Sequence, residues 1–271
     1  MSKTYKQQIE SYYNDDAADF DARYWRNPVL QRIRQDFREQ VKRHSFKNML
    51  EIGFGTGLDL LHFTRTHPDV KIAGIDISSG MHQLALERLS KEKLSNVKVF
   101  RASVEEAGEL FVNSRFDMIY VFFGALNTVE DLQRASDTLY RLAMPGGVLV
   151  LSFVNKYYVA GMFIELLKMR FKSAFSRLKP EWGGYSPERN LPSRCYTPSE
   201  IKKIFSGFKL KSRKGYSIVY PAWYYPGLIQ LLSRVSRWLW KTDMLLNKTP
   251  LWRFGEYTLF VFQKPDDVRK H

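Results

Sequence analysis

The chain has 271 residues, a formal net charge of +14 and a single cysteine, Cys195. This length suits one α/β domain that carries an elaborated cap. A lone cysteine excludes an internal disulfide, and the histidines and the cysteine lack metal-ligand spacing. No apolar run approaches the roughly eighteen residues of a membrane span. We therefore expect a metal-free cytoplasmic protein that is soluble or peripheral at a membrane.

The first predicted element with clear end signals is a helix that begins at Asn27. Asn27 offers a capping side chain, and Pro28 stands at the first helical position. Apolar residues then recur at helical spacing, at Leu30, Ile33, Phe37 and Val41. We therefore expect this helix to pack one apolar face onto a sheet.

A buried strand that ends in a glycine-rich turn is predicted over residues 49–57. The strand carries Glu51 near its end. The turn contains three alternating glycines, Gly53, Gly55 and Gly57. Glycines at these positions let the backbone bend sharply and approach a ligand without interference from a Cβ atom. We expect the next helix to begin directly after the turn, with its N-terminal amides facing an anionic group of that ligand.

A second apolar run, residues 72–76, ends in Asp76 about one βα unit further along the chain. A carboxylate at the end of such a strand can accept hydrogen bonds from ribose hydroxyls. The nicotinamide-dinucleotide fingerprint needs a glycine where Leu58 stands, so that cofactor class is excluded. Glu51, the glycine turn and Asp76 together predict a nucleoside pocket.

Further strands are predicted at residues 97–100 and 116–121, and residues 142–150 hold the turn into the next one. The order of these landmarks resembles that of the class I S-adenosylmethionine-dependent methyltransferases, of the type that acts on small molecules or lipids. The resemblance covers residues 45–155, the predicted cofactor-binding core. It implies fold class α/β, with a Rossmann-like, seven-stranded, mostly parallel sheet whose last strand is antiparallel.

The resemblance also implies the cofactor, S-adenosylmethionine, and the residues that contact it. These are Glu51, Gly53, Phe54, Gly55, Thr56, Gly57, Asp76, Ile77, Ser103, Val104 and Phe122. Many members of the family have an aspartate where Ser103 aligns, so adenine would here meet the Ser103 hydroxyl and the Val104 amide. The Asn-Pro-Pro-Tyr motif of enzymes that methylate amino groups of nucleobases or glutamine does not follow the fourth strand, which counts against those acceptors.

Residues 1–44 are predicted to form lid helices. The stretch 12–21 looks like the N-terminal segment that many small-molecule methyltransferases fold over the cofactor. Two alternatives stay open for Tyr12 and Tyr13. In the first, their hydroxyl groups contact the cofactor or the acceptor. In the second, their rings only pack within the lid helix.

Two insertions are predicted in the second half of the chain. Residues 156–194 form a cap insertion that contains a helix of mixed apolar and basic surface. Residues 195–271 complete the core sheet, with strands at 208–212 and 257–262. Residues 220–252, between these two strands, form the second insertion, which is basic and aromatic.

The excess of positive charge lies in the same half of the chain. Residues 1–150 hold twenty Lys and Arg against twenty Asp and Glu, residues 156–214 hold fourteen against four, and residues 215–271 hold eight against four. Trp238 beside Arg234 suits an in-plane helix at an anionic membrane surface. The alternatives are a helix whose apolar side closes the substrate pocket and a basic face that is only solvated.

We therefore expect an S-adenosylmethionine-dependent methyltransferase that aligns a small-molecule or lipid-like acceptor, an anionic one included, for in-line transfer and excludes water. No catalytic residue is predicted. No histidine lies between residues 83 and 270, so a base in the cap must be a carboxylate or a tyrosine. The candidates are Glu165, Glu181, Tyr157, Tyr158 and Tyr185. An RNA or protein methyltransferase that uses the basic half of the chain, and a catalytically silent scaffold, stay as alternatives. The lack of a separate RNA-binding module counts against nucleic acid.

Overall fold

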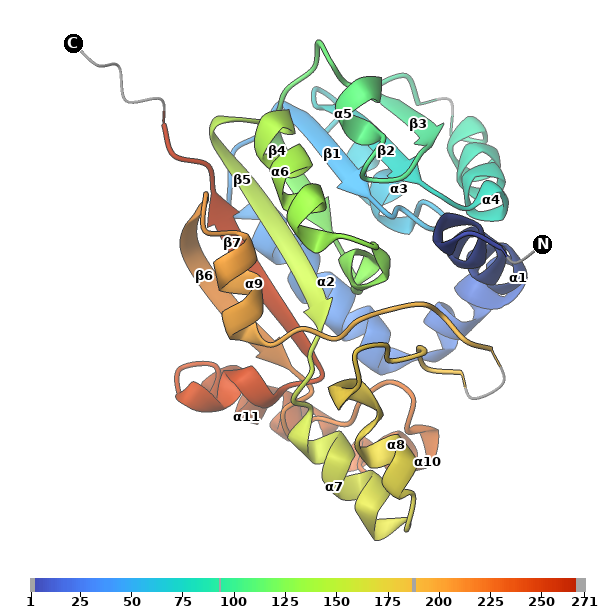
Figure 1. The fold of residues 1–271 in the computed structure, drawn as a ribbon, viewed down its shortest axis with the longest axis vertical. Coiled ribbons are helices and arrows are strands. Elements are labelled where there is room, and N and C mark those ends of the chain that lie inside the picture. The colour runs from blue at the N-terminus through green and yellow to red at the C-terminus, as the bar shows by residue number, and fades with distance from the viewer. Residues whose placement is uncertain (1–2, 93, 187–188, 267–271) are drawn as a thin grey trace.

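Figure 1 shows the computed structural model of the chain, which describes residues 3–92, 94–186 and 189–266 as a twisted sheet with helices on both faces. The seven strands lie in the order β3-β2-β1-β4-β5-β7-β6. Their bounds are β1 Asn48–Ile52, β2 Lys71–Asp76, β3 Val97–Arg101, β4 Phe116–Val121, β5 Ala143–Val154, β6 Lys209–Tyr216 and β7 Tyr257–Gln263. Strands β1 to β5 pair in parallel, whereas β7 is antiparallel to both β5 and β6. The predicted Rossmann-like fold, its antiparallel last strand included, is confirmed.

Helices α1 and α2 precede the first strand, and the other helices connect the strands. Their bounds are α1 Tyr5–Arg26, α2 Pro28–Lys42, α3 Leu58–Thr66, α4 Ser79–Ser90, α5 Ala107–Leu110, α6 Leu132–Leu142, α7 Val159–Leu167, α8 Phe171–Ala174, α9 Pro198–Ile204, α10 Pro226–Leu231 and α11 Ser236–Leu246. Short 3-10 helices are η1 Ala125–Thr128, η2 Ser176–Leu178, η3 Ser233–Val235 and η4 Pro250–Phe254. Within the described ranges, every helix is too short or too polar to span a bilayer.

The central strands bury both of their faces, because successive side chains of a strand point to opposite sides of the sheet. In β4, Ile119 packs with Leu139 of α6 in one core, whereas Met118 packs with Phe37 of α2 in the other. Both cores consist of fully buried aliphatic and aromatic side chains. Double burial explains why the strands read as continuous apolar runs rather than as alternating ones.

The helix predicted to begin at Asn27 is confirmed as α2. The Asn27 side-chain oxygen accepts hydrogen bonds from the backbone N–H groups of Val29 and Leu30, both at 3.1 Å. The amide of the same side chain donates to the backbone oxygen of Trp223 at 2.7 Å. One capping residue thus starts a core helix and also fixes the second insertion to it.

The helix expected within residues 156–194 is present as α7, and it is followed by shorter helical pieces. Helix α7 ends at Leu167 because Met169 adopts a left-handed backbone, with φ at 57°. The short elements α8 and η2 follow it. The two insertions pack against each other through Tyr158, Ala222 and Tyr225. Figure 1 shows them together at the lower end of the molecule.

Candidate functional site

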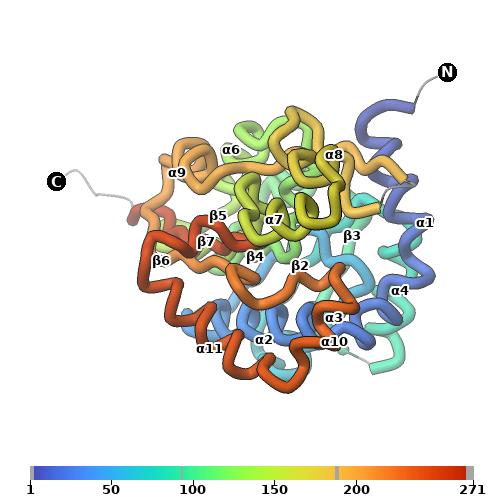
Figure 2. The backbone as a smooth tube through the Cα atoms, turned by 90° about the horizontal axis from the view of Figure 1, so that it is seen from below, coloured from blue at the N-terminus to red at the C-terminus, as the bar shows by residue number. Residues whose placement is uncertain are grey.

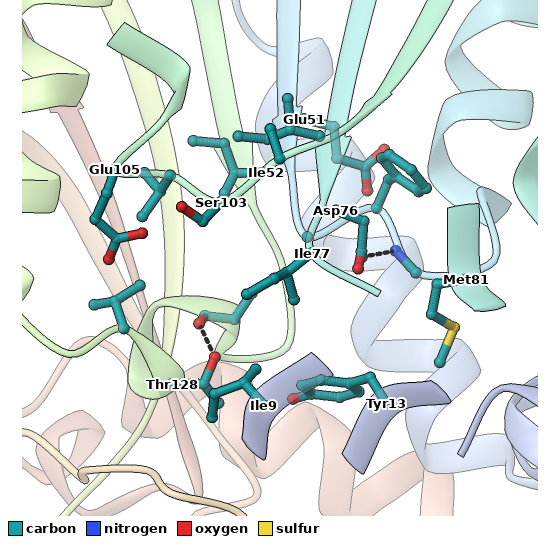
Figure 3. Close-up of a pocket in the computed structure, with 18 of the residues that line it drawn as sticks. Ile9, Tyr13, Glu51, Ile52, Asp76, Ile77, Met81, Ser103, Glu105 and Thr128 are labelled. Carbon is teal, nitrogen blue, oxygen red and sulfur yellow. Dashed lines mark hydrogen bonds between the residues drawn. The ribbon is translucent and has the colours of Figure 1, made fainter. Parts of the chain in front are cut away.

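A cavity of about 800 Å³ lies at the carboxyl ends of the central strands and under α1. In Figure 3, Glu51 and Asp76 point into it from β1 and β2, and Ile9 and Tyr13 of α1 face them across the open space. Ser103 and Glu105, which follow β3, form a further part of its wall. Open α/β sheets bind ligands at this edge, so the cavity stands where the fold itself predicts a site.

Nine of the eleven residues predicted to contact the cofactor line this cavity. They are Glu51, Gly53, Phe54, Gly55, Asp76, Ile77, Ser103, Val104 and Phe122. Thr56 and Gly57 do not line it. The Thr56 hydroxyl is turned toward the lid and donates to a carboxylate oxygen of Asp21 at 2.5 Å, and Gly57 is the residue before α3. Sequence spacing alone does not tell which residues of a tight turn face the ligand.

The glycine turn has the backbone that its composition predicts. Gly53, Gly55 and Gly57 have φ angles of 71°, 56° and 78°, a region that residues with a Cβ atom rarely adopt. A Cβ atom on Gly53 would lie 2.6 Å from the Cβ atom of Ala125. Glycine at position 53 is therefore required both by its own backbone and by the close approach of η1.

Asp76 holds this turn in place. One carboxylate oxygen of Asp76 accepts a hydrogen bond from the Gly55 N–H at 2.8 Å, and the other accepts one from the Ser78 N–H at 2.9 Å. Burial raises the pKa of Asp76 to about 6, against the opposing effect of these N–H donors. Each carboxylate oxygen has a further lone pair, so Asp76 can still accept hydrogen bonds from a ligand in the cavity.

A second group of charges lies deeper in the cavity. The buried Glu51 carboxylate accepts a hydrogen bond from the Tyr120 hydroxyl at 2.7 Å. Burial, and next the nearby carboxylate of Asp59, raise the pKa of Glu51 well above its usual range. Arg34 and Arg38 donate to the two oxygens of Asp59 at 2.8 and 2.6 Å. The floor of the cavity is thus a buried and largely paired set of charges.

Helix α1 covers the cavity and is bonded to both parts of the molecule. On the core side, the Asn14 side-chain oxygen accepts hydrogen bonds from the Ser78 hydroxyl at 2.7 Å and from the Gly80 N–H at 3.0 Å. On the side of the first insertion, Arg189 donates to Asp16 at 2.8 Å. These bonds place α1 between the core and the cap.

A second cavity of about 400 Å³ adjoins the first one. Five residues line both cavities, namely Tyr13, Phe20, Arg34, Phe123 and Thr128. The walls of the second cavity are rich in aromatic rings from α1, from both insertions and from β7. These rings belong to Tyr12, Tyr24, Trp182, Tyr185, Trp223, Tyr224 and Tyr257. The arrangement can hold a flat or apolar molecule next to whatever fills the first cavity.

A buried ion pair supports this aromatic wall. The Arg177 guanidinium lies 3.2 Å from a carboxylate oxygen of Glu256, and the Tyr185 hydroxyl donates to the same oxygen at 2.5 Å. The Arg177 guanidinium also lies 4.8 Å from the ring centre of Trp182. Burial raises the pKa of Glu256, and the cation beside it opposes that shift. Arg177 and Glu256 have no motif around them in the sequence, and sequence reasoning missed them.

Of the five candidates for a base in the cap, Tyr185 alone lines either cavity. Tyr158 is buried between the insertions, and Tyr157 is exposed. Glu165 pairs with Lys168, and Glu181 accepts a hydrogen bond from the Asn190 side chain. Among the residues that the structure describes, no three His, Cys, Asp or Glu side chains gather as metal ligands would.

Several lining residues were not among the predicted contacts. Ile9 comes from α1, Met81 from α4, Glu105 from the segment after β3, and Val129 from the segment after β4. The only signal for the last two was their position, since loops at the carboxyl ends of the strands reach the same edge of the sheet. The resemblance predicted a lid over residues 12–21, whereas the contribution of Ile9, earlier in α1, is set by tertiary packing that has no local sequence signal.

Comparison with known proteins agrees with this geometry. Residues 49–147 match a family model described as a methyltransferase domain. The chain is 29% identical over 204 residues to a demethylmenaquinone methyltransferase of Bacteroides fragilis, which is 73% of this chain and 75% of that protein. Among solved structures, the cyclase SpnF has a TM-score of 0.65 at 16% identity over 98% of both chains. The N-methyltransferase NodS of Bradyrhizobium japonicum, in complex with S-adenosylhomocysteine, has a TM-score of 0.58 at 15% identity over 96% of this chain and all of that one.

Proposed function

Because the chain belongs to the class I S-adenosylmethionine-dependent methyltransferases, we propose that it transfers the methyl group to an apolar, ring-containing or lipid-like small molecule bound in the second cavity. The observation that carries this proposal is the pair of adjoining cavities, one ending at Asp76 and the glycine turn and the other walled by aromatic rings. An acceptor in the second cavity would meet the cofactor where the two cavities share their lining.

The residues of the first cavity fit S-adenosylmethionine. Gly53 and Gly55 line the cavity with backbone that carries no side chain, which suits a ligand pressed against the main chain. The free lone pairs of Asp76 suit the two ribose hydroxyls. Ser103 and Val104, after β3, would meet the adenine. In this proposal Thr56 and Gly57 shape the turn and do not touch the cofactor.

The lining of the second cavity supports the proposal of an apolar or ring-containing acceptor. Its aromatic rings favour a planar or apolar group, and the relative from Bacteroides fragilis carries a name that refers to a lipid quinone. Proteins of similar fold include a cyclase and an N-methyltransferase, so the fold leaves the acceptor atom open. The charged residues of the second cavity's wall are Asp16, which accepts hydrogen bonds from Arg23 and Arg189, and Arg34, which donates to Asp59.

Methyl transfer requires mainly that the protein position the acceptor and exclude water. The sulfonium of the bound cofactor supplies an activated methyl group for in-line displacement. The lid residues Tyr13 and Phe20, which line both cavities, would hold the acceptor in line and keep water out. The Tyr185 hydroxyl, with the Glu256 carboxylate behind it, is a polar group of the wall that can orient a hydroxyl or amine of the acceptor.

The function is tested by incubating the purified protein with S-adenosylmethionine carrying a labelled methyl group and a panel of acceptors. The panel contains demethylmenaquinone in its reduced form, a small hydrophobic phenol, a short phosphorylated amine and bulk transfer RNA. We expect label in the first two. Label in RNA alone would replace the proposal with the RNA alternative, and cofactor binding without transfer to any acceptor would favour a silent scaffold.

Replacing Trp223 by alanine should damage the acceptor site and spare the cofactor site. Trp223 lines the second cavity and not the first, and its ring lies 4.9 Å from that of Tyr185. Losing this apolar contact should lower kcat/KM for the acceptor about 10–150-fold, from about 1.5–3 kcal/mol of side-chain burial. The Kd for S-adenosylmethionine, measured by calorimetry, should not change. The matched control is Tyr140→Ala, on α6, which lines neither cavity. Equal losses in the two variants would contradict the assignment.

Cofactor binding should weaken below pH 6. The pKa of Asp76 in the unliganded protein is about 6, and ribose hydroxyls donate best to its ionised form. Since binding selects the carboxylate, affinity should be nearly full at pH 7, fall by about half at pH 6, and approach a tenfold loss for each further pH unit. Calorimetry between pH 5 and 7 measures the slope. Asp76→Asn should lose the slope, and a slope that survives in this variant would assign the proton to Glu51 instead.

A further inference from the structure

The two insertions expose an unusual amount of apolar surface at one end of the molecule. In the first insertion, the exposed large apolar residues include Val159, Phe163, Leu167, Met169, Phe171 and Phe175. Leu167 and Met169 are 70% and 72% exposed. Monomeric proteins rarely leave such a cluster in contact with water unless it binds something.

Three of these apolar residues lie on the same exposed face of α7. Val159, Phe163 and Leu167 follow one another at intervals of four in α7 and therefore share one face of it. The opposite face of α7 carries Gly161, which is buried, and Ile164 on the flank of the helix packs in the contact between the insertions. The exposed stripe is thus the face of α7 that the protein leaves uncovered.

The second insertion contributes a matching face at the same end. Leu231 is 78% exposed and Trp238 is 66% exposed. Trp238, Lys241 and Leu245 lie on one face of α11, at intervals of three and four, while Leu239 and Trp240 pack toward the core. Figure 2, which views this end of the molecule, shows α7, α8, α10 and α11 spread across it.

The charge on this end is almost entirely positive. Exposed basic residues in and beside α7, α8, α10 and α11 include Lys168, Arg170, Lys172, Arg234, Arg237 and Lys241. The acidic residues of these four helices, Glu165 and Asp243, are paired or buried. Glu165 pairs with Lys168, and Asp243 is buried and accepts hydrogen bonds from the backbone N–H groups of Val219 and Tyr220.

We propose that this cap face, formed by the exposed residues of α7, α8, α10 and α11, docks on the surface of an anionic phospholipid bilayer. The apolar side chains would enter the boundary between headgroups and acyl chains, and the basic ones would meet the lipid phosphates. Trp238 suits the headgroup level because its ring is apolar and its N–H is polar. A second copy of the chain is a poor occupant, since two cationic faces repel.

The same segments line the second cavity, because Trp182 and Tyr185 belong to the first insertion and Trp223 and Tyr224 to the second. A bilayer under the cap face would therefore lie next to the walls of the proposed acceptor site. The docking itself does not depend on the proposed acceptor, so it is measured with no acceptor and no cofactor present.

The test is sedimentation of the full chain with vesicles of phosphatidylcholine, alone or mixed with phosphatidylglycerol. The wild type should bind the mixed vesicles at low salt and dissociate at high salt, where charges are screened. The triple variant Arg170→Gln, Lys172→Gln, Arg237→Gln should lose about fivefold in partition per charge, or about a hundredfold in all. The control triple Lys91→Gln, Lys98→Gln, Lys202→Gln removes as many exposed charges elsewhere and should bind like the wild type.

A second pair of variants tests the apolar contribution. Leu167→Gln with Phe171→Gln should lower partition at least tenfold, since each removes an exposed apolar side chain that would be buried in lipid. Leu86→Gln with Val112→Gln, at exposed positions on α4 and after α5, should have no effect. The proposal is overturned if the wild type ignores anionic vesicles at low salt, or if control and cap variants lose binding equally. It is also overturned if sedimentation velocity shows a dimer that Leu167→Gln disrupts, because a second copy would then cover this face.

Discussion

Replacing Arg177 by alanine is expected to lower the free energy of unfolding by about 3–5 kcal/mol, more than any other single change considered for this chain. Arg177 is buried and lies 3.2 Å from the Glu256 carboxylate, which is itself fully buried. The variant would leave that carboxylate buried without its cation. Urea unfolding followed by circular dichroism measures the loss as a shift of the midpoint at constant slope.

An exposed pair with the same separation provides the control. Arg194 also lies 3.2 Å from a carboxylate oxygen, that of Glu200, but its side chain is 55% exposed. Arg194→Ala should therefore cost less than about 1 kcal/mol. The double variant Arg177→Met, Glu256→Gln should recover part of the loss, because it removes both buried charges. If Arg177→Ala and Arg194→Ala cost the same, the buried pair does not stabilise the cap.

Arg177→Ala should impair methyl transfer to the acceptor and leave cofactor binding unchanged. Tyr185 shares its carboxylate partner with Arg177 and lines the second cavity, whereas neither Arg177 nor Glu256 lines the first one. Below its melting temperature, Arg177→Ala should thus bind S-adenosylmethionine normally and transfer the methyl group poorly.

The first cavity could be predicted from the sequence because its chemistry is local. A strand that ends in alternating glycines determines where the backbone bends, and Asp76 follows at the end of the next strand. Thr56 shows the limit of this reasoning. It stands in the middle of the turn, yet its hydroxyl is turned to Asp21 of the lid, and no spacing rule separates it from Gly55.

The cap and its buried pair could not be predicted for two physical reasons. Arg177 and Glu256 are far apart in the sequence and meet only because the first insertion folds back onto the start of β7. The break after α7 occurs at Met169, which has a left-handed backbone. Helices that end in this way usually have Gly or Asn at that position, so methionine gives no signal in the sequence. Periodicity could therefore predict an apolar and basic helix in residues 156–194 but not where it ends.

Replacing Asp76 by alanine is expected to weaken S-adenosylmethionine binding by about 1.5–3 kcal/mol, which is about 10–150-fold in Kd. On the proposed binding mode, the variant loses the acceptor for the ribose hydroxyls. It also leaves the N–H groups of Gly55 and Ser78 without their partner, so part of the loss would come from a loosened turn. Calorimetric titration measures the loss. The control Glu105→Ala, which removes another carboxylate of the cavity wall, should have a much smaller effect.

A change in the ligand separates the lost ribose bonds from the loosened turn. An analogue of S-adenosylmethionine that lacks the 2′-hydroxyl should bind the wild type about tenfold more weakly than the cofactor does, since one hydrogen bond to a charged group is missing. In Asp76→Ala the two ligands should bind equally, because the group that distinguishes them is gone. The coupling between the two changes isolates the contact between Asp76 and the ribose. If the variant still discriminates as strongly as the wild type, Asp76 only supports the glycine turn, and another residue recognises the ribose.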